Sequence, residues 1–209
     1  GGGLCTDLGA NVIDGNVFAW NDARDNGAGV RLNAESTNTF MNNVVTDNLG
    51  HGVMSSHYNS SVIVNNTIVS NNSTGLYIFV CCGSTFAIPT AMNNVLAYNG
   101  EGVRSNTGIA FSFINNDVFG NSNNYAGSIA NQTGIGGNFS ADPGFVAFSN
   151  DNNYANDDYG LTLSSSCLDT GANALGHGVS FDFLDAPRPV DGDGNGSALY
   201  DVGAYERPE

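Results

Sequence analysis

Apolar residues recur at two fixed positions around a repeated asparagine in this chain. One lies three residues before the Asn and the other two residues after it, and both are filled in all five copies. This is the pattern of side chains that point into a shared core from strands whose residues alternate between two faces. The first row is Ile13, Phe40, Ile63, Ala91 and Phe113, and the second is Phe18, Val45, Ile68, Leu96 and Val118.

A second Asn follows each of these asparagines after five residues. The pairs are Asn16 and Asn21, Asn43 and Asn48, Asn66 and Asn71, Asn94 and Asn99, and Asn116 and Asn121. An amide at the same place in successive repeats predicts turns of chain that stack on one another, with the side-chain amides hydrogen-bonded in columns. The residue between each first Asn and its second apolar position faces outward and is of mixed type, namely Val17, Val44, Thr67, Val95 and Asp117.

Each repeat supplies further strands. In four copies a Gly opens a second short strand, as in 29–32 and 52–55, and a third strand such as 61–64 leads back to the next Asn. Successive first asparagines are 27, 23, 28 and 22 residues apart. Leucine-rich repeats share this period, but the chain has neither their Leu framework nor helical periodicity. Three strands per repeat predict an all-β, right-handed parallel β-helix of about five coils, roughly 24 Å long.

The repeat fades after Asn121, which predicts two regions. Residues 1–125 form the coils, and residues 126–209 form the last coil or coils and an irregular C-terminal cap. Twenty acidic residues against five basic ones give a net charge of −15, which repels nucleic acid and anionic membrane and excludes both as partners. The chain also has no apolar run long enough to span a bilayer.

The start at GGGL, without Met, predicts a mature product or a fragment of a longer protein, in which a cap or further coils precede Gly1. The cysteines fit an oxidising compartment, and therefore export. Their pairing stays open, because the adjacent Cys81 and Cys82 can pair with each other or with Cys5 and Cys167.

The last third of the chain carries a different, ordered set of motifs. They are NFSADPGFV (138–146), YGLTLSSSCLDTG (159–171), DAPRPVDGDGNG (185–196) and DVGAYE (201–206). In this order they resemble the closing region of the bacterial β-helix proteins called choice-of-anchor Q domain proteins, within the pectate-lyase-like superfamily. The resemblance implies a secreted or cell-surface β-helix. It implies no single activity, because the superfamily holds lyases, hydrolases, epimerases and non-enzymes.

One loop has the spacing of a calcium site. Asp191, Asp193 and Asn195 place oxygen ligands at alternate positions, and Gly196 follows where the backbone turns. The carbonyl of Ser197 and the carboxylate of Asp201 are candidates to complete the shell. This predicts a structural Ca²⁺ ion that fixes the loop onto the last coil. The alternative is a solvated turn without a metal.

Three other acidic residues are expected to have structural roles. Asp182 and Asp185 are expected to pair with Arg188. Asp169 is expected to be a turn or cap residue.

Aligned repeats also predict a binding surface. The second strands place Arg31, Tyr77 and Arg104 in one outward row, with His51 just ahead of it. Aromatic rings stack on sugars and Arg pairs with uronate carboxylates, so this row is the candidate carbohydrate site. A second row, beside the second Asn of each repeat, contains Trp20, Asp47, Ser70 and Tyr98, and its two aromatic residues are further candidates for the carbohydrate site.

Catalysis is left open by the sequence. A polysaccharide lyase needs a base, for which Arg31, Arg104, His51 and His57 are available. An inverting hydrolase needs two carboxylates roughly 6.5–9.5 Å apart, and Asp25, Asp47 and Glu101 do not share a row. The favoured hypothesis is a secreted or surface β-helix, stabilised by calcium, that binds a polysaccharide or cell-surface glycan or has a structural or adhesive role. The alternative is a polysaccharide lyase or glycoside hydrolase.

Overall fold

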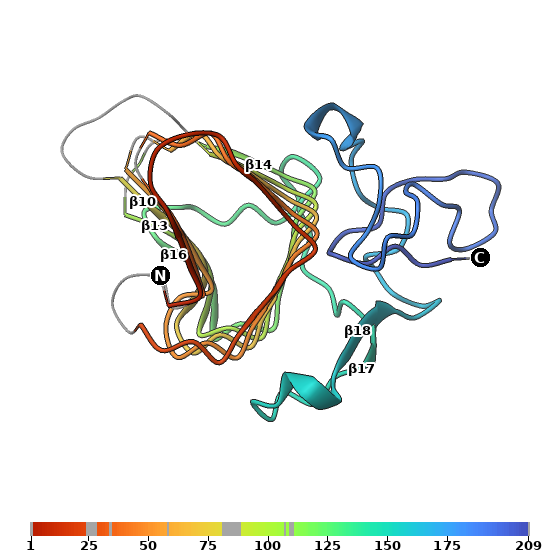
Figure 1. Ribbon diagram of the computed structural model, residues 1–209. Coiled ribbons are helices and arrows are strands. Elements are labelled where there is room, and N and C mark those ends of the chain that lie inside the picture. The colour runs from red at the N-terminus through yellow and green to blue at the C-terminus, as the bar shows by residue number, and fades with distance from the viewer. Residues whose placement is uncertain are drawn as a thin grey trace.

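Three parallel sheets surround one core in the computed structural model, which describes residues 2–23, 29–33, 35–57, 59–80, 89–106, 108 and 111–208. Viewed along the stack, the coils superpose as a ring with the C-terminal residues against one side (Figure 1). Asp25, Cys81 and Cys82 lie outside the described residues. The predicted parallel β-helix of about five coils is confirmed.

Each coil contributes one strand to each sheet. Sheet 1 contains β1 (Leu4–Thr6), β4 (Val30–Leu32), β7 (Val53–Ser56), β10 (Thr74–Phe79), β13 (Glu101–Ser105) and β16 (Asn123–Gly127). Sheet 2 contains β2 (Val12–Asp14), β5 (Thr39–Met41), β8 (Val62–Val64), β11 (Thr90–Met92) and β14 (Ser112–Ile114). Sheet 3 contains β3 (Val17–Ala19), β6 (Val44–Thr46), β9 (Thr67–Val69), β12 (Val95–Ala97) and β15 (Asp117–Phe119).

The strand register stacks equivalent residues directly. Phe40 pairs with Ile13 on one side and Ile63 on the other, and Val45 pairs likewise with Phe18 and Ile68. Both predicted apolar rows therefore point into the core, and Phe40, Ile63 and Ile68 are fully buried there.

Two sharp corners, before and after each sheet 3 strand, explain the asparagine columns. At each corner one residue adopts a positive φ, such as Asn65 at 52° and Ser70 at 55°, and the next residue is a ladder Asn. The backbone N–H and the side-chain Nδ2 of Asn66 both donate to Oδ1 of Asn94, at 3.0 and 2.9 Å. Nδ2 of Asn66 also donates to the carbonyl oxygens of Phe40 and Val64. Each amide thus satisfies backbone groups of its own coil and of the previous one, which would otherwise be buried without partners.

A glycine at the start of five of the six sheet 1 strands is required by this packing. A Cβ on Gly52 would lie 2.8 Å from Nδ2 of Asn71 and 2.9 Å from the carbonyl oxygen of Gly75. No side chain fits between the second amide column and the next coil.

We expect Asn66→Ala to lower the free energy of unfolding by about 2 kcal/mol, because the buried N–H and Nδ2 of Asn43 lose their acceptor, Oδ1 of Asn66. Denaturant unfolding measures the change. Asn16→Ala in the exposed first coil is the matched control and should cost less. An equal cost at both positions would mean that burial does not govern the ladder.

The chain closes the far end of the solenoid after β16 and then turns back. It crosses the mouth of the ring (Figure 1), and Phe139 adds a partial sixth rung by accepting a hydrogen bond from the N–H of Val118 and donating one to the carbonyl of Asn116. Residues 140–208, here called the C-terminal segment, contain an antiparallel pair, β17 (Phe145–Ala147) and β18 (Asp158–Leu161). They also contain two single-turn 3₁₀ helices, η1 (Tyr154–Asn156) and η2 (Leu175–His177).

The C-terminal segment lies along the flank of the coils, whereas the sequence suggested a cap on the last coil. It buries the outward rows of sheets 2 and 3 in two apolar clusters. Against sheet 3 it packs Tyr159, Leu161 and Val202 on Val44, Val69 and Val95. Against sheet 2 it packs Ala174, Val179 and Tyr200 on Met41, Val64 and Met92. Two of the three outer faces are therefore covered, and the outer face of sheet 1 lies on the opposite side of the ring (Figure 1).

A buried ion pair within the C-terminal segment corrects one prediction. Nε of Arg188 lies 3.1 Å from Oε2 of Glu206, and both side chains are almost completely buried. The expected partner Asp182 instead holds a turn, because its Oδ1 accepts the N–H groups of Leu184 and Ala186. Asp185, an exposed residue with a φ of 60°, forms the same turn.

Cys5 and Cys167 do not form a disulfide, because both are free thiols. Cys5 is exposed on β1, whereas Cys167 is buried where the C-terminal segment packs against sheet 3. A disulfide between Cys81 and Cys82, which lie outside the described part of the chain, stays a prediction.

Candidate functional site

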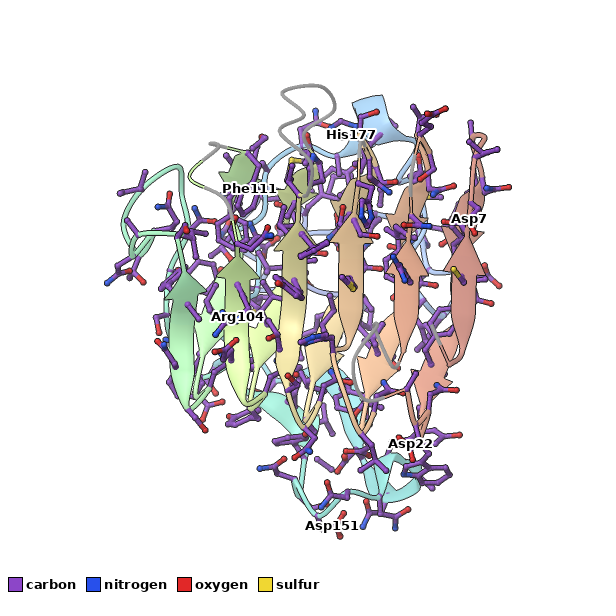
Figure 2. The ribbon with its side chains drawn as sticks, turned by 90° about the vertical axis from the view of Figure 1, so that its left-hand side faces the viewer. Asp7, Asp22, Arg104, Phe111, Asp151 and His177 are labelled. Carbon is purple, nitrogen blue, oxygen red and sulfur yellow. The ribbon has the colours of Figure 1, made fainter. Side chains whose placement is uncertain are left out.

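The outer face of sheet 1 carries the predicted row of side chains in strict register. Arg31 pairs with Met54, Met54 with Tyr77, and Tyr77 with Arg104. Figure 2 shows this sheet face-on, with Arg104 over its strands and the C-terminal segment behind. The sequence alignment of the second strands is confirmed by this register.

A hydrogen-bonded group lies at one end of the row. Glu101 accepts two hydrogen bonds from Arg104, at 2.7 Å from Nε and 2.6 Å from Nη2, and a third at 2.8 Å from the hydroxyl of Thr74. Nδ1 of His51 accepts the backbone N–H of Thr74 at 3.3 Å. The bonds from Arg104 are the main cause that lowers the pKa of Glu101, with smaller contributions from Thr74 and His51. Glu101 is therefore a carboxylate at neutral pH, and its charge is balanced by Arg104.

Aromatic rings continue from this group along β10. The ring of Tyr77 lies 4.9 Å from that of His51 and 5.7 Å from that of Phe79, and Phe79 lies 5.4 Å from His57. Tyr77 is half-buried, so part of its ring faces solvent. These residues form a continuous strip of rings on the outer face of sheet 1.

Arg31, at the other end of the row, is also engaged. Its Nε donates to Oγ of Ser56 at 3.2 Å and its Nη2 donates to Oδ1 of Asn33 at 3.2 Å. The amide of Asn33 in turn donates to Asp7. Neither Arg31 nor Arg104 presents an uncommitted guanidinium to a ligand.

Trp20, Tyr98 and Asp47 are not on this face. They lie on the corner after sheet 3, each with a positive φ, where the C-terminal segment runs back along the stack. The ring of Tyr98 stacks on Phe148 at 4.6 Å, and that of Trp20 lies 4.6 Å from Tyr154.

Asp47 is 6% exposed and lies beneath Tyr154, whose backbone donates a hydrogen bond to it. Burial is the main cause that raises its pKa. The structure therefore separates Trp20, Tyr98 and Asp47 from Tyr77, Arg31 and Arg104, and it places Asp47 and Glu101 on different faces.

A row that sequence reasoning missed holds the C-terminal segment at the other corner. It consists of the first Asn of each Asn-Asn dipeptide. Asn65 donates to the carbonyl oxygens of Asp201 and Gly203, and Asn93 donates to that of Ala172. Asn42 and Asn115 bond Phe181 and Thr170 in the same way. The repeated dipeptide was the available signal, because the second Asn of each pair already had a role in the ladder.

The predicted calcium loop brings three carboxylates together. Oxygens of Asp169, Asp191 and Asp193 all lie within 4.8 Å of one another. Asp191 also accepts the N–H groups of Asn195 and Gly196. Asp169 was expected to serve only in a turn, and its sequence distance from the loop gave no indication of this contact.

Asn195, Ser197 and Asp201 take structural parts around that loop. Oδ1 of Asn195 accepts the N–H of Ser197. Asp201 is 1% exposed, and its carboxylate accepts the N–H groups of Asp169 and Arg207 at 2.7 Å each. Burial raises the pKa of Asp201 to about 6. The hydrogen bond from the N–H of Asp169 to Asp201 helps to fix the backbone of Asp169.

The coil architecture defines the chain as a parallel β-helix protein. Residues 8–144, more than half of the chain, match the family model described as periplasmic copper-binding protein (NosD), and the chain belongs to this family. No curated protein and no solved structure matches the chain. The family description makes the chain a periplasmic or extracellular β-helix module. Among the described residues, no helix is long and apolar enough to cross a bilayer.

Proposed function

We propose that this β-helix module binds a neutral carbohydrate on the outer face of sheet 1. The observation that carries the proposal is that the C-terminal segment covers the outer rows of sheets 2 and 3, whereas the strip of rings around Tyr77 lies on the remaining face. Tyrosine combines an apolar ring face with a polar hydroxyl, which suits a surface that is both apolar and hydrogen-bonding, as a sugar is.

The charges of this face favour a neutral sugar over a uronate. Arg104 is bound to Glu101 through two hydrogen bonds, and Arg31 is bound to Ser56 and Asn33. A uronate carboxylate would have to compete with these partners. The net charge of −15 would also repel an acidic polymer.

We expect Tyr77→Ala to weaken binding of a neutral oligosaccharide about tenfold, which corresponds to roughly 1.4 kcal/mol, because the ring that stacks on the sugar is lost. Calorimetric titration with a panel of gluco-, xylo- and manno-oligosaccharides measures the change. Phe181→Ala is the matched control, since Phe181 is a 55% exposed ring on the C-terminal segment. Equal loss in both variants, or binding of polygalacturonate that survives Tyr77→Ala, would contradict the proposal.

The geometry gives less support to a hydrolase. Among the described residues, Glu101 is the one carboxylate on the strands of sheet 1, and its lowered pKa does not suit a general acid. Asp7 follows β1, which lies four strands from β13, or about 19 Å away at the usual strand spacing. That distance is well outside the range of an inverting pair. For a lyase, absorbance of the unsaturated product during incubation with uronate polymers is the direct test.

We further propose that Asp169, Asp191 and Asp193 hold a Ca²⁺ ion that stabilises the C-terminal segment. Hard oxygen donors suit calcium, and the three carboxylates lie within 4.8 Å of one another. Their mutual repulsion would be relieved by a divalent cation. The loop rests on the flank of the coils, since the neighbouring Asp201 and Gly203 are bonded by Asn65.

We expect EDTA to lower the melting temperature of the protein, because a ligand at a hundred times its Kd contributes about 2.7 kcal/mol to stability. Asp169→Asn should abolish the sensitivity to EDTA. Asp185→Asn is the matched control, since Asn tolerates the positive φ found there, and it should keep the full shift. A melting temperature that EDTA leaves unchanged would contradict the proposed Ca²⁺ site.

Among the described residues, the one cluster of three side chains that could hold a metal ion does not have the donors that suit copper, the metal named in the family description. Copper prefers imidazole and sulfur donors. His51 and His57 flank β7, so about 20 Å of extended chain separates them. The thiol of Cys167 is buried against Asp117, and the carboxylates of Asp169, Asp191 and Asp193 form an all-oxygen set.

A further inference from the structure

A buried carboxylate oxygen lies without a partner at the corner after sheet 3. Asp47 is 6% exposed, and its Oδ2 atom has no hydrogen-bond partner among the described residues. A charged oxygen that is buried in this way loses its hydration without gaining a protein contact in exchange. It therefore calls for a proton, a water molecule or a cation, and the groups around Asp47 distinguish between these three.

A loop of the C-terminal segment, residues 149–157, covers this corner. The indole N–H of Trp20, in the first coil, donates to the carbonyl oxygen of Asn152 at 3.1 Å. The backbone of Tyr154 donates to the carboxylate of Asp47, in the second coil. The loop is therefore bonded to two successive coils, and the unpartnered oxygen lies between the loop and the corner.

The same loop brings two more carboxylates toward Asp47. Burial and, after it, repulsion from Asp157 and Asp151 raise the pKa of Asp47. Oδ2 of Asp157 accepts the hydroxyl of Tyr159 at 3.2 Å, and that hydroxyl lies 3.0 Å from Oγ1 of Thr46, the neighbour of Asp47 in the sequence. Figure 2 shows Asp151 on this loop, beyond the ends of the sheet 1 strands. The corner thus gathers oxygen atoms of like charge and two hydroxyl groups.

A cation fits this arrangement better than a proton or a water molecule. A proton on Oδ2 of Asp47 would be a donor, and that atom has no acceptor within reach. A water molecule would supply a hydrogen bond but would leave the repulsion between the carboxylates. We infer that Asp47 and Asp157 hold a Ca²⁺ ion between the second coil and the loop, with Asp151 beside it. Carboxylate and hydroxyl oxygens are the hard donors that Ca²⁺ prefers, and such an ion ties the C-terminal segment to the coils.

Terbium(III), a luminescent ion that takes the same oxygen donors as Ca²⁺, tests this site through Trp20, the single Trp of the chain. The indole is hydrogen-bonded to the loop, so its excitation reaches an ion held beside Asp47. The measurement is made in the Asp169→Asn chain, which lacks the other proposed Ca²⁺ site. We expect saturable terbium luminescence that Ca²⁺ displaces. Adding Asp47→Asn should weaken terbium binding about tenfold or more, and Asn tolerates the φ of 54° found there.

Two further variants in the same background complete the test. Asp157→Asn changes the loop instead of the buried corner and should weaken binding as Asp47→Asn does. Asp22→Asn is the control, because Asp22 is an exposed carboxylate two residues from Trp20, and it should leave the affinity unchanged. Melting in EDTA shows that each variant is folded.

Three results would overturn the inference. These are the absence of saturable luminescence, luminescence that survives both Asp47→Asn and Asp157→Asn, and an equal loss in Asp22→Asn, which would mean adventitious binding to the acidic surface. Because every chain in the test carries Asp169→Asn, none of these results bears on the ion proposed at Asp169.

Discussion

Glu206→Gln is expected to lower the free energy of unfolding by about 3–5 kcal/mol at pH 8, the cost of leaving a buried charge without its partner. Arg188 and Glu206 lie 3.1 Å apart and are almost completely buried. The carboxylate also accepts the N–H groups of Val190 and Asp201. A glutamine keeps one acceptor, but its NH₂ group would face a guanidinium and an N–H, which are both donors.

The pH of this experiment matters. Burial raises the pKa of Glu206 to about 7, so the side chain is ionised at pH 8 and largely protonated at pH 5. Between these pH values the folded protein binds a proton that the unfolded chain releases, which stabilises the native protein but not the variant, so the cost of the substitution should grow on acidification. Denaturant unfolding at both pH values measures it.

Glu101→Gln is the matched control, because it breaks a second Arg–Glu pair in the same protein. The Arg104–Glu101 pair is 37% and 24% exposed, and exposed pairs contribute about 0–1 kcal/mol. Equal costs for Glu206→Gln and Glu101→Gln would contradict the view that the Arg188–Glu206 pair holds the C-terminal segment together. The double replacement Arg188→Met/Glu206→Leu should recover only part of the stability, because it removes both buried charges but leaves the N–H groups of Val190 and Asp201 without their acceptor.

Asp117→Asn is expected to stabilise the protein by about 3 kcal/mol at pH 8. Asp117 is 0% exposed on β15, where its Oδ1 accepts the N–H of Ala141 and its Oδ2 contacts the thiol of Cys167. Burial raises its pKa from 3.8 to about 7, and the carboxylate of Asp142 adds to the shift. Three pKa units correspond to roughly 4 kcal/mol at full ionisation.

The sign of the pH dependence follows from this raised pKa. The folded state retains a proton that the unfolded chain releases between about pH 4 and pH 7, so this contribution to stability is complete below pH 4 and is lost as the pH rises to 7. Acidification from pH 8 to pH 5 should therefore stabilise the native protein. Asp201 and Glu206 contribute in the same direction.

Comparing the pH dependence of stability in the native protein and in Asp117→Asn isolates the contribution of the Asp117 carboxyl group. The difference in unfolding free energy between native protein and variant should be largest at pH 8 and should fall by about 3 kcal/mol at pH 5. Parallel pH profiles, or a variant less stable than the native protein at pH 8, would show that Asp117 does not carry a buried charge.

The coils were predictable from sequence because each coil has the same local packing and hydrogen-bonding requirements. A corner buries backbone groups that a side-chain amide must satisfy, so Asn66 and Asn71 recur in every coil, and Gly52 marks the close approach of the next one. Core residues such as Ile63 and Ile68 follow from strand alternation. All of these signals lie within one repeat.

The position of the C-terminal segment was not predictable in the same way, because many of its contacts join residues more than a hundred positions apart. The C-terminal segment covers the outward-facing Val44 and Val95, but nothing in the pattern identified the covering residues. Trp20 and Tyr98 were therefore assigned to a ligand, whereas their rings pack on the C-terminal segment.

The sequence predicted the candidate site only where strand register alone determines which residues are neighbours. Register placed Arg31, Tyr77 and Arg104 in one row, but the partners that neutralise the two arginines depend on rotamers and on neighbouring coils. Asp169 approaches Asp191 only through the fold of the C-terminal segment. The resemblance to choice-of-anchor Q proteins stays a prediction, because the family match ends at residue 144.

The central claim is that the C-terminal segment covers the outer faces of sheets 2 and 3 and leaves the ring strip of sheet 1 for a ligand. Hydroxyl-radical footprinting of the intact protein, resolved by mass spectrometry, tests it most directly. Met41 and Met92, which are 9% and 3% exposed beneath the segment, should react far more slowly than in the unfolded chain, while Tyr77 should be labelled readily. Rapid oxidation of Met41 and Met92 in the folded protein would contradict the account.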